Sequence, residues 1–344
     1  MRLKNTWING DCLKELKKMD AESVDLVITS PPYHNLRVYS NDPCDLSNCE
    51  SYEEYYYLLG LVIAECSRVL KPGCKFCMVY EDYNYTIGRD GKVGQESLTG
   101  DLNKLFLDNG FTLHTKIINE KYTAQRSMIS NGMLYYRNMR ARDSILAANH
   151  NFVYVYKKEG DCPLIKASDV TLAEWAEWAS GVWHCPVSSI GHTTPMSEEM
   201  TRRCIKLWSN PLDTVLDPFC GCGCTNKQAI LAHRNAIGIE LNKQFYDLGK
   251  EDFDKWEDEV YETDDSPEKM LERFNEQLVV GKLQNAKAKE EKEEKQKLTK
   301  KKKDIREEIK ELESQLVLLG MKKSEIKKLK DQAKEECNVK NENA

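Results

Sequence analysis

Short apolar runs alternate with helical segments along the first 250 residues, and this alternation constrains the fold more than any other feature of the chain. The runs at 24–28 and 74–80 are almost continuously apolar, which is typical of strands buried on both faces of a parallel sheet, and a further strand is predicted to end in Asp217-Pro218-Phe219. Between them, the pattern predicts a long helix ended by Lys71-Pro72-Gly73 and another over 97–109 ended by Gly110. We therefore predict an α/β domain with helices on both faces of its sheet.

The remaining pattern divides the chain into one large domain and an appendage. Further strands are predicted near residue 7, at 111–119 and at 151–158, and a capped helix over 197–208. We predict the following segments: a domain over 1–262, a basic and aromatic insertion at 119–150, a short segment at 157–182, a linker at 263–282 and a helical tail at 283–338.

The tail is rich in lysine and glutamate and carries an apolar stripe. The stripe recurs at spacings of four and three, as in a coiled-coil seam, and consists of Ile305, Ile309, Leu312, Leu316 and Leu319. Gly320 is expected to cap this helix, and Ser324 to open a shorter one across Ile326 and Leu329. The pattern allows a homodimer, a complex with a protein partner, or a helical hairpin folded on itself.

Composition limits the cellular setting but not the partner. A net charge of -6 does not favour nucleic acid, although one basic face on an acidic protein can suffice. The N-terminal residues lack the apolar core of a signal peptide and no run reaches membrane-spanning length, so a cytoplasmic location with reduced cysteines is expected. Cys74-x-x-Cys77 lacks the matched second pair of a zinc site, and we expect no metal.

The strand at 24–28 runs directly into Ser30-Pro31-Pro32-Tyr33. Prolines remove backbone donors and fix φ, so the chain leaves the sheet in one stiff, extended conformation. A rigid loop with a solvent-facing tyrosine would explain the prolines alone. A hydroxyl, an exposed carbonyl group and a ring held together also suit a flat ligand that bears an amino group.

A second motif lies almost two hundred residues later, where a strand ends in Asp217-Pro218-Phe219. Gly221 and Gly223 follow it and open a helix near Asn226. Glycines there let backbone amides approach a ligand at a helix N-terminus. Glu240 ends the next strand, where an acidic side chain typically binds the ribose hydroxyls of a nucleoside cofactor. The three-glycine dinucleotide fingerprint is absent.

Together these motifs resemble those of the amino-group DNA methyltransferases, which use S-adenosyl-L-methionine. Residues 30–33 match the family's catalytic motif, and residues 217–223 match its DPFxGxG cofactor motif. The family's usual Gly-Ser-Gly-Thr-Thr turn is here Gly-Cys-Gly-Cys-Thr, over 221–225. Because the catalytic motif comes first, the order resembles the permuted β type. The resemblance spans about residues 5–250 and implies a Rossmann-like, circularly permuted methyltransferase fold acting on double-stranded DNA.

The resemblance also implies a mechanism, in which the target base is flipped out of the duplex. Tyr33 would stack on the base, a contact worth about 1–3 kcal/mol. Ser30 and the Pro31 carbonyl group would accept hydrogen bonds from its amino group, with Pro32 completing the loop. The implied cofactor-binding residues are Asp11, Thr194, Pro195, Asp217, Phe219, Gly221, Gly223 and Glu240. For Asp11, capping the helix at 12–18 is an equally good explanation.

Serine in the first catalytic position favours cytosine N4 over adenine N6, whose enzymes more often carry Asp or Asn there. The insertion supplies candidate DNA contacts, since arginine suits phosphates and guanine edges. These candidates are Arg126, Arg137, Arg140 and Arg142, which alternate with tyrosines. A solvated basic loop is the alternative for the insertion. For the whole chain, the alternatives are a catalytically silent scaffold and an RNA or protein methyltransferase.

Overall fold

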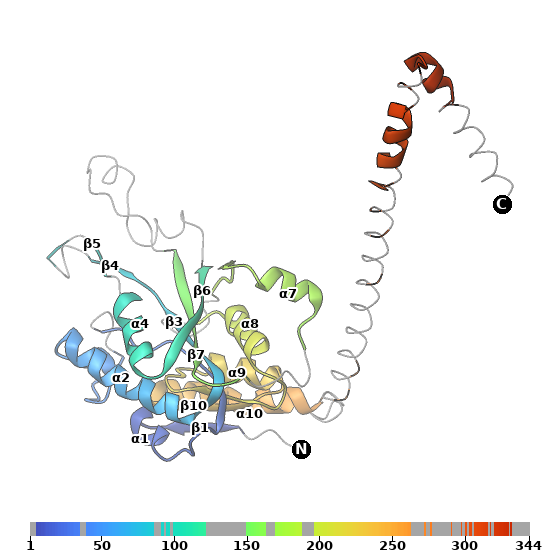
Figure 1. Ribbon diagram of the computed structural model, residues 1–344. Coiled ribbons are helices and arrows are strands. Elements are labelled where there is room, and N and C mark those ends of the chain that lie inside the picture. The colour runs from blue at the N-terminus through green and yellow to red at the C-terminus, as the bar shows by residue number, and fades with distance from the viewer. Residues whose placement is uncertain are drawn as a thin grey trace, which may run out of the picture. The chain divides into compact units, whose positions relative to one another are not determined.

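The computed structural model of the 344-residue chain describes most of its first 262 residues (Figure 1). The described ranges there are 5–34, 39–85, 91–92, 94–96, 99–121, 149–162, 169–187 and 196–262. In the tail they are chiefly 306–315 and 320–329. The chain divides into two compact units, residues 1–277 and residues 278–344.

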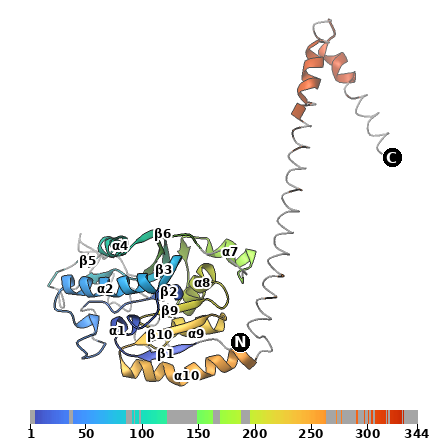
Figure 2. The same cartoon turned by 60° about the horizontal axis from the view of Figure 1, so that its bottom comes forward.

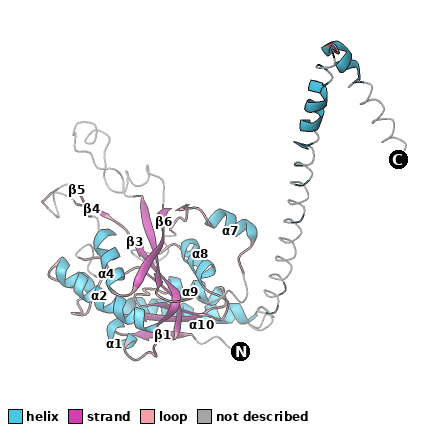
Figure 3. Ribbon diagram, in the orientation of Figure 1, coloured by secondary structure: helices cyan, strands magenta, loops and turns pink. Residues whose placement is uncertain are grey.

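The first unit is built on an eight-stranded mixed sheet in the order β1-β10-β9-β2-β3-β7-β6-β8 (Figure 3). The strands are β1 (Thr6–Asn9), β2 (Val24–Thr29), β3 (Leu70–Tyr80), β6 (Phe111–Glu120), β7 (His150–Lys158), β8 (Val182–Trp183), β9 (Thr214–Asp217) and β10 (Asn235–Glu240). The five strands from β1 to β3 are parallel, whereas β7 is antiparallel to both of its neighbours. A separate small hairpin pairs β4 (Tyr83–Tyr85) with β5 (Gly94–Glu96).

Helices cover both faces of this sheet, as the alternation in the sequence predicts (Figures 1 and 2). On one face lie α1 (Cys12–Leu16), α2 (Tyr52–Val69) and α4 (Thr99–Asp108). On the other lie α8 (Glu198–Trp208), α9 (Cys224–Leu231) and α10 (Lys243–Glu262). A 3₁₀ turn, η1 (Leu46–Asn48), precedes α2, and α7 (Leu172–Trp178) precedes β8.

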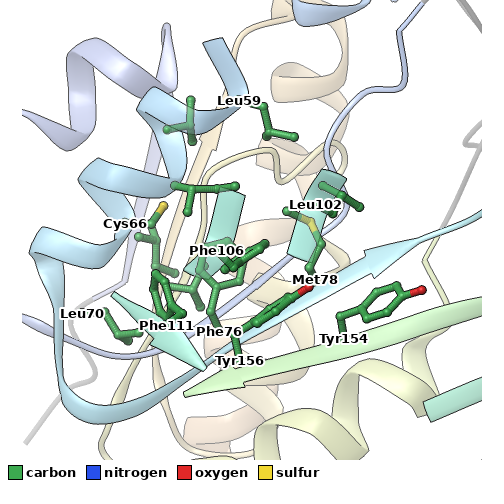
Figure 4. Close-up of a cluster of buried hydrophobic side chains, with 14 of the residues drawn as sticks. Leu59, Cys66, Leu70, Phe76, Met78, Leu102, Phe106, Phe111, Tyr154 and Tyr156 are labelled. Atoms are coloured by element: carbon green, nitrogen blue, oxygen red, sulfur yellow. The ribbon is translucent and has the colours of Figure 1, made fainter. Parts of the chain in front are cut away.

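Two hydrophobic cores result, because successive residues of a strand point to opposite faces. Val27 belongs to the core under α2, while Leu26 and Ile28 belong to the core under α8 and α9. The first core contains a group of aromatic rings, in which Phe106 of α4 stacks on Tyr156 with ring centroids 3.7 Å apart (Figure 4). The sheet is therefore fixed from both sides, and its strand ends are rigid supports for a site.

The predicted elements are confirmed with small shifts at their ends. Lys71-Pro72-Gly73 does not form a separate turn, since β3 begins at Leu70 directly after α2. The helix predicted to start near Asn226 begins at Cys224. In α7 and β8, Trp178 and Trp183 are buried, whereas Trp175 is 57% exposed. Cys74 and Cys77 are buried in β3, and the described residues hold no cluster suited to a metal ion.

The second unit is helical over 306–315 and over 323–329, with a turn at Gly320 between them. The amide of Gly320 donates to the carbonyl oxygen of Val317, as a helix end requires. Of the predicted stripe, Ile309 is 42% exposed and Leu312 52% exposed. Ile305, Leu316 and Leu319 lie outside the described residues, so the coiled coil stays a prediction. None of the described helices of either unit is both long enough and apolar enough to span a membrane.

Candidate active site

The site residues gather where the parallel strands end, because parallel strands share one carboxyl edge. Ser30 follows the last residue of β2, and Asp217 is the last residue of β9, the next strand in the sheet. Glu240 ends β10, one strand further along. The fold therefore brings the two sequence motifs side by side at one edge, although they are far apart in the chain.

The loop after β2 is held by aromatic side chains behind it. The hydroxyl of Tyr55, from α2, donates to the carbonyl oxygen of Pro32 at 3.0 Å. The rings of Tyr33 and Tyr80 meet edge to face, with centroids 4.6 Å apart. Pro31 is buried, while Ser30, Pro32 and Tyr33 are half-buried. This arrangement fixes the loop from the core side and leaves Ser30 and Tyr33 at its surface.

The phenol of Tyr33 is neutral in this environment. Burial raises its pKa well above the usual value, and the carboxylate of Glu81 raises it further. The neighbouring Ser30 side chain acts in the opposite direction and lowers the pKa of Tyr33. Tyr33 can therefore offer a neutral ring face to a ligand, which suits stacking on a base.

Asp217 is buried, with 2% of its surface exposed, and both of its carboxylate oxygens are hydrogen-bonded. One oxygen accepts from the hydroxyl of Thr29 at 2.7 Å and from the amide of Phe219 at 3.0 Å. The other accepts from the hydroxyl of Thr225 at 2.6 Å. Burial raises the pKa of Asp217 to about 6, and the two hydroxyl groups and the amide lower it.

The glycine turn has a left-handed backbone, with φ of 54° at Gly221 and 85° at Gly223. Gly223 is also the N-cap of α9, and no side chain caps that helix. A Cβ atom at Gly223 would lie 2.2 Å from the Trp7 ring, so only glycine fits between the turn and β1. Uncapped amides at a helix N-terminus bind an anionic or polar ligand well.

Glu240 stands beside this turn as a half-buried carboxylate. It accepts hydrogen bonds from the amides of Gly221, at 2.8 Å, and of Asn242, at 2.7 Å. Burial raises the pKa of Glu240 to about 7, and the two amides lower it. An acceptor held in place next to uncapped helix amides fits the ribose and the polar groups of a nucleoside cofactor.

The two cysteines of the turn differ in their surroundings. The Cys224 thiol lies 3.5 Å from the carbonyl oxygen of Met196 and donates to it. Burial raises the pKa of Cys224 to about 12 and that of Cys222 to about 11, so both thiols are neutral at pH 7. Neutral thiols of serine-like size leave the uncapped amides of the turn accessible to a polar ligand, and the residues present fit a nucleoside cofactor.

Asp11 acts as the N-cap of α1, where its carboxylate accepts from the amide of Leu13 at 3.0 Å. The capping explanation offered by the sequence is confirmed, and the adenine contact stays a prediction. Phe219 is partly buried against the first core. Six predicted site residues lie outside the described residues: Thr194, Pro195, Arg126, Arg137, Arg140 and Arg142.

Sequence reasoning missed four residues that support the site: Thr29, Thr225, Tyr55 and Tyr80. The two threonines carried a signal, because each hydroxyl lies directly beside a motif residue. The two tyrosines carried none, since α2 and β3 contain many aromatic residues and only the packing selects Tyr55 and Tyr80.

Comparison with known proteins agrees with this geometry. Residues 24–251 match the N6/N4 methyltransferase family, described as DNA methylase. The type II methyltransferase M.BglI of Bacillus subtilis is 26% identical over 301 residues, covering 71% of this chain and 84% of that protein. The DNA adenine methyltransferase YhdJ of Escherichia coli K12 is 28% identical over 267 residues, covering 71% and 81%.

Solved structures resemble the first unit in fold. A protein of Thermus thermophilus described as a DNA modification methylase, solved with S-adenosyl-L-methionine, has a TM-score of 0.60 at 25% identity. That match covers 73% of this chain and 94% of the solved one. The cytosine-N4-specific PvuII DNA methyltransferase has a TM-score of 0.56 at 18% identity, covering 75% and 93%, which shows a shared fold.

Proposed function

The chain belongs to the N6/N4 DNA methylase family, and from this premise we propose that it methylates the N4 amine of a cytosine flipped out of double-stranded DNA. Its methyl donor is S-adenosyl-L-methionine, as in the family. One observation carries the choice of cytosine: the residue that opens the rigid Pro-Pro loop at the end of β2 is Ser30. Its hydroxyl is a compact, neutral acceptor beside a neutral tyrosine ring.

The chain's own groups orient the amine. Ser30 Oγ and the carbonyl oxygen of Pro31 accept its two hydrogens, and this turns the nitrogen lone pair out of conjugation with the ring. Tyr33 stacks on the base once the base has left the duplex. The acceptors are preorganised, because Tyr55 and Tyr80 hold the loop before the base arrives.

The cofactor side lies one strand away, which suits transfer between two bound groups. The amides at the start of α9 would hold polar groups of the donor, and Glu240 its ribose hydroxyls. When bound, the donor supplies an electrophilic methyl group. Thr194 and Pro195 are proposed to close over its methionine end, and Asp11 to approach its adenine ring.

The product decides between cytosine N4 and adenine N6. Mixed-sequence duplex DNA is incubated with the purified protein and methyl-labelled cofactor, then digested to nucleosides and separated. We expect label in N4-methylcytosine. Label in N6-methyladenine would overturn the cytosine assignment and agree with the name of the Escherichia coli relative. Label absent from DNA, with tight cofactor binding, would favour the RNA or protein alternative.

DNA binding is proposed to involve the basic insertion at 119–150, through Arg126, Arg137, Arg140 and Arg142. The logarithm of DNA affinity falls linearly with the logarithm of the salt concentration, and each arginine that neutralises a phosphate makes this slope steeper by about one. A triple glutamine variant at Arg137, Arg140 and Arg142 therefore tests the insertion by fluorescence anisotropy with duplex DNA across a salt series. A wild-type slope in that variant would remove the insertion from the DNA surface.

The tail at 283–338 is proposed to be a helical appendage whose exposed Ile309 and Leu312 pack against a second helix. The second helix is either the tail's own or that of a partner, including a second copy of the chain. The permuted β type is proposed for the domain itself, because β9 and β10 come late in the chain yet lie between β1 and β2.

A further inference from the structure

We propose that Thr29 is a positioning residue for methyl transfer. Its hydroxyl group, through the buried carboxylate of Asp217, holds Ser30 in register with the glycine turn at 221–223. The proposal deepens the proposed function and rests on it, because Ser30 must contact the amine for its position to matter. Thr29 itself touches neither the base nor the cofactor.

The observation is a chain of three hydrogen bonds centred on one carboxylate. Thr29 Oγ1 and the amide of Phe219 donate to one oxygen of Asp217, at 2.7 Å and 3.0 Å. Thr225 Oγ1 donates to the other oxygen at 2.6 Å. Thr29 directly precedes Ser30, and Thr225 lies in the first turn of α9, two residues after Gly223. One carboxylate thus joins the catalytic loop to the cofactor turn.

Burial makes this connection strong. Thr29 is 1%, Thr225 1% and Asp217 2% exposed, so water does not compete for the hydrogen bonds. Hydrogen bonds to an ionised acceptor are shorter and roughly twice as strong as neutral ones. Because Asp217 is buried and both of its oxygens are used, we assign it to this connection instead of direct contact with the methionine moiety.

The pairing of β2 with β9 does not reach this part of the edge, although β2 pairs with β3 as far as Thr29 and Met78. The ladder between β2 and β9 ends at Val27 and Leu216, before either motif begins. The hydrogen bond from Thr29 to Asp217 links β2 and β9 beyond the end of that ladder, next to the site. Since the two prolines make the next residues stiff, the position of Thr29 is transmitted to Ser30.

Thr29→Val tests the role, because valine keeps the β-branched shape and removes only the donor. The single-turnover rate of methyl transfer should fall by about 10- to 100-fold, as expected when a reacting group is misplaced by a fraction of an ångström to 1 Å. The dissociation constant for S-adenosyl-L-methionine should change less than about threefold, since Thr225 still holds the turn. Thr29→Ser restores the donor and should recover most of the rate.

The matched control is Thr112→Val on β6, an exposed strand threonine whose hydroxyl lies 3.5 Å from the carbonyl oxygen of Lys157. This control should leave rate and affinity unchanged. Rate and cofactor affinity falling together in Thr29→Val, or Thr29→Ser failing to recover the rate, would overturn the positioning role. An unchanged rate in Thr29→Val would overturn it as well.

A double-mutant cycle tests the connection through the carboxylate. Thr225→Val should weaken cofactor binding, and Thr29→Val combined with Thr225→Val should give a rate loss that differs from the product of the two single losses. Strictly multiplicative losses would show that the threonines act independently and would overturn the connection. All rates are followed on whichever methylated nucleoside the wild-type enzyme makes. Failure of the cytosine assignment therefore leaves this test intact, and only a wild type without DNA methylation would remove its premise.

Discussion

The two halves of the site are held by different physical means. The loop over 30–33 rests on neutral aromatic groups, with Tyr55 bonded to the Pro32 carbonyl oxygen and Tyr80 packed on Tyr33. The cofactor half is held by two carboxylates, those of Asp217 and Glu240, which accept hydrogen bonds from backbone amides and hydroxyl groups. Aromatic packing and one neutral hydrogen bond therefore hold Tyr33 and the Pro-Pro backbone, whereas charged acceptors hold the cofactor side and, through Thr29, the position of Ser30.

This difference predicts different sensitivities. Burial raises the pKa of Asp217 to about 6 and that of Glu240 to about 7, so the cofactor half titrates near neutral pH. The aromatic half does not, because the pKa of Tyr33 is raised well above its usual value. Variants in the cofactor half should therefore change stability and cofactor affinity, whereas variants in the aromatic half should change turnover.

The largest effect is expected from Asp217→Ala. The variant leaves two buried hydroxyl groups and the Phe219 amide without their acceptor, and this should lower the free energy of unfolding by about 3 kcal/mol or more. Cofactor affinity should fall with it. Urea unfolding and cofactor titration measure the two effects. Asp217→Asn is the matched control, since an amide can still accept from Thr29 and Phe219, and it should lose less. Wild-type stability in Asp217→Ala would contradict the role of charge in this half.

The second largest effect is expected from Tyr33→Ala, which should lower turnover. Loss of stacking worth about 1–3 kcal/mol corresponds to a rate decrease of about 5- to 150-fold. Cofactor affinity should stay within about twofold, because the ring acts on the flipped base alone. Tyr33→Phe keeps the ring and should retain most of the rate. Equal losses of rate and cofactor affinity in the alanine variant would make Tyr33 a structural residue and remove the contrast between the two halves.

Glu240 should give the site a pH dependence near neutrality. If the ionised carboxylate binds the ribose hydroxyls, a pKa of about 7 lowers cofactor affinity by about tenfold between pH 8 and pH 6. Glu240→Gln should bind more weakly at pH 8 and lose this pH dependence. Isothermal titration across the pH series measures both. A wild-type affinity that does not change over this range would place the ribose elsewhere.

The pH dependence of unfolding in the cofactor-free protein is a second test of the raised pKa of Glu240. The folded pKa of Glu240 is raised above its unfolded value of about 4.5, so the folded state binds more protons between pH 4.5 and pH 7. Wild-type stability should therefore decrease relative to Glu240→Gln as pH rises through this range. A wild-type stability that instead rises with pH relative to Glu240→Gln would mean that the folded pKa of Glu240 lies below its unfolded value.

The smallest effect is expected from Tyr55→Phe, which removes one hydroxyl and keeps the ring. Loss of its hydrogen bond to the Pro32 carbonyl oxygen should lower the free energy of unfolding by about 1 kcal/mol. Turnover should fall only a fewfold, since the prolines and Tyr80 still hold the loop. A loss as large as that of Tyr33→Ala would show that the Tyr55 hydrogen bond, and not the packing of Tyr80, holds Tyr33 and the Pro-Pro backbone in place.

The local structure of this protein follows from short stretches of its sequence. The continuous apolar runs predicted strands that are buried on both faces, and the predicted capped helix over 197–208 has Ser197 as its N-cap. The two motifs follow strand ends, as predicted, and Gly221 and Gly223 have positive φ. Such features are local, because strand periodicity, helix caps and glycine turns depend on residues only a few positions apart.

The contacts between these local elements depend on how the whole chain folds. β9 and β10 enter the sheet between β1 and β2, and this order brings Asp217 to Thr29, which is 188 residues away in the chain. The same packing places Trp7 against Gly223. From the sequence alone, an aspartate at a strand end is equally compatible with contact to a ligand and with a buried hydrogen-bonded connection between two loops. The choice depends on which donors surround the oxygens and on whether water reaches them, and both are properties of the folded chain.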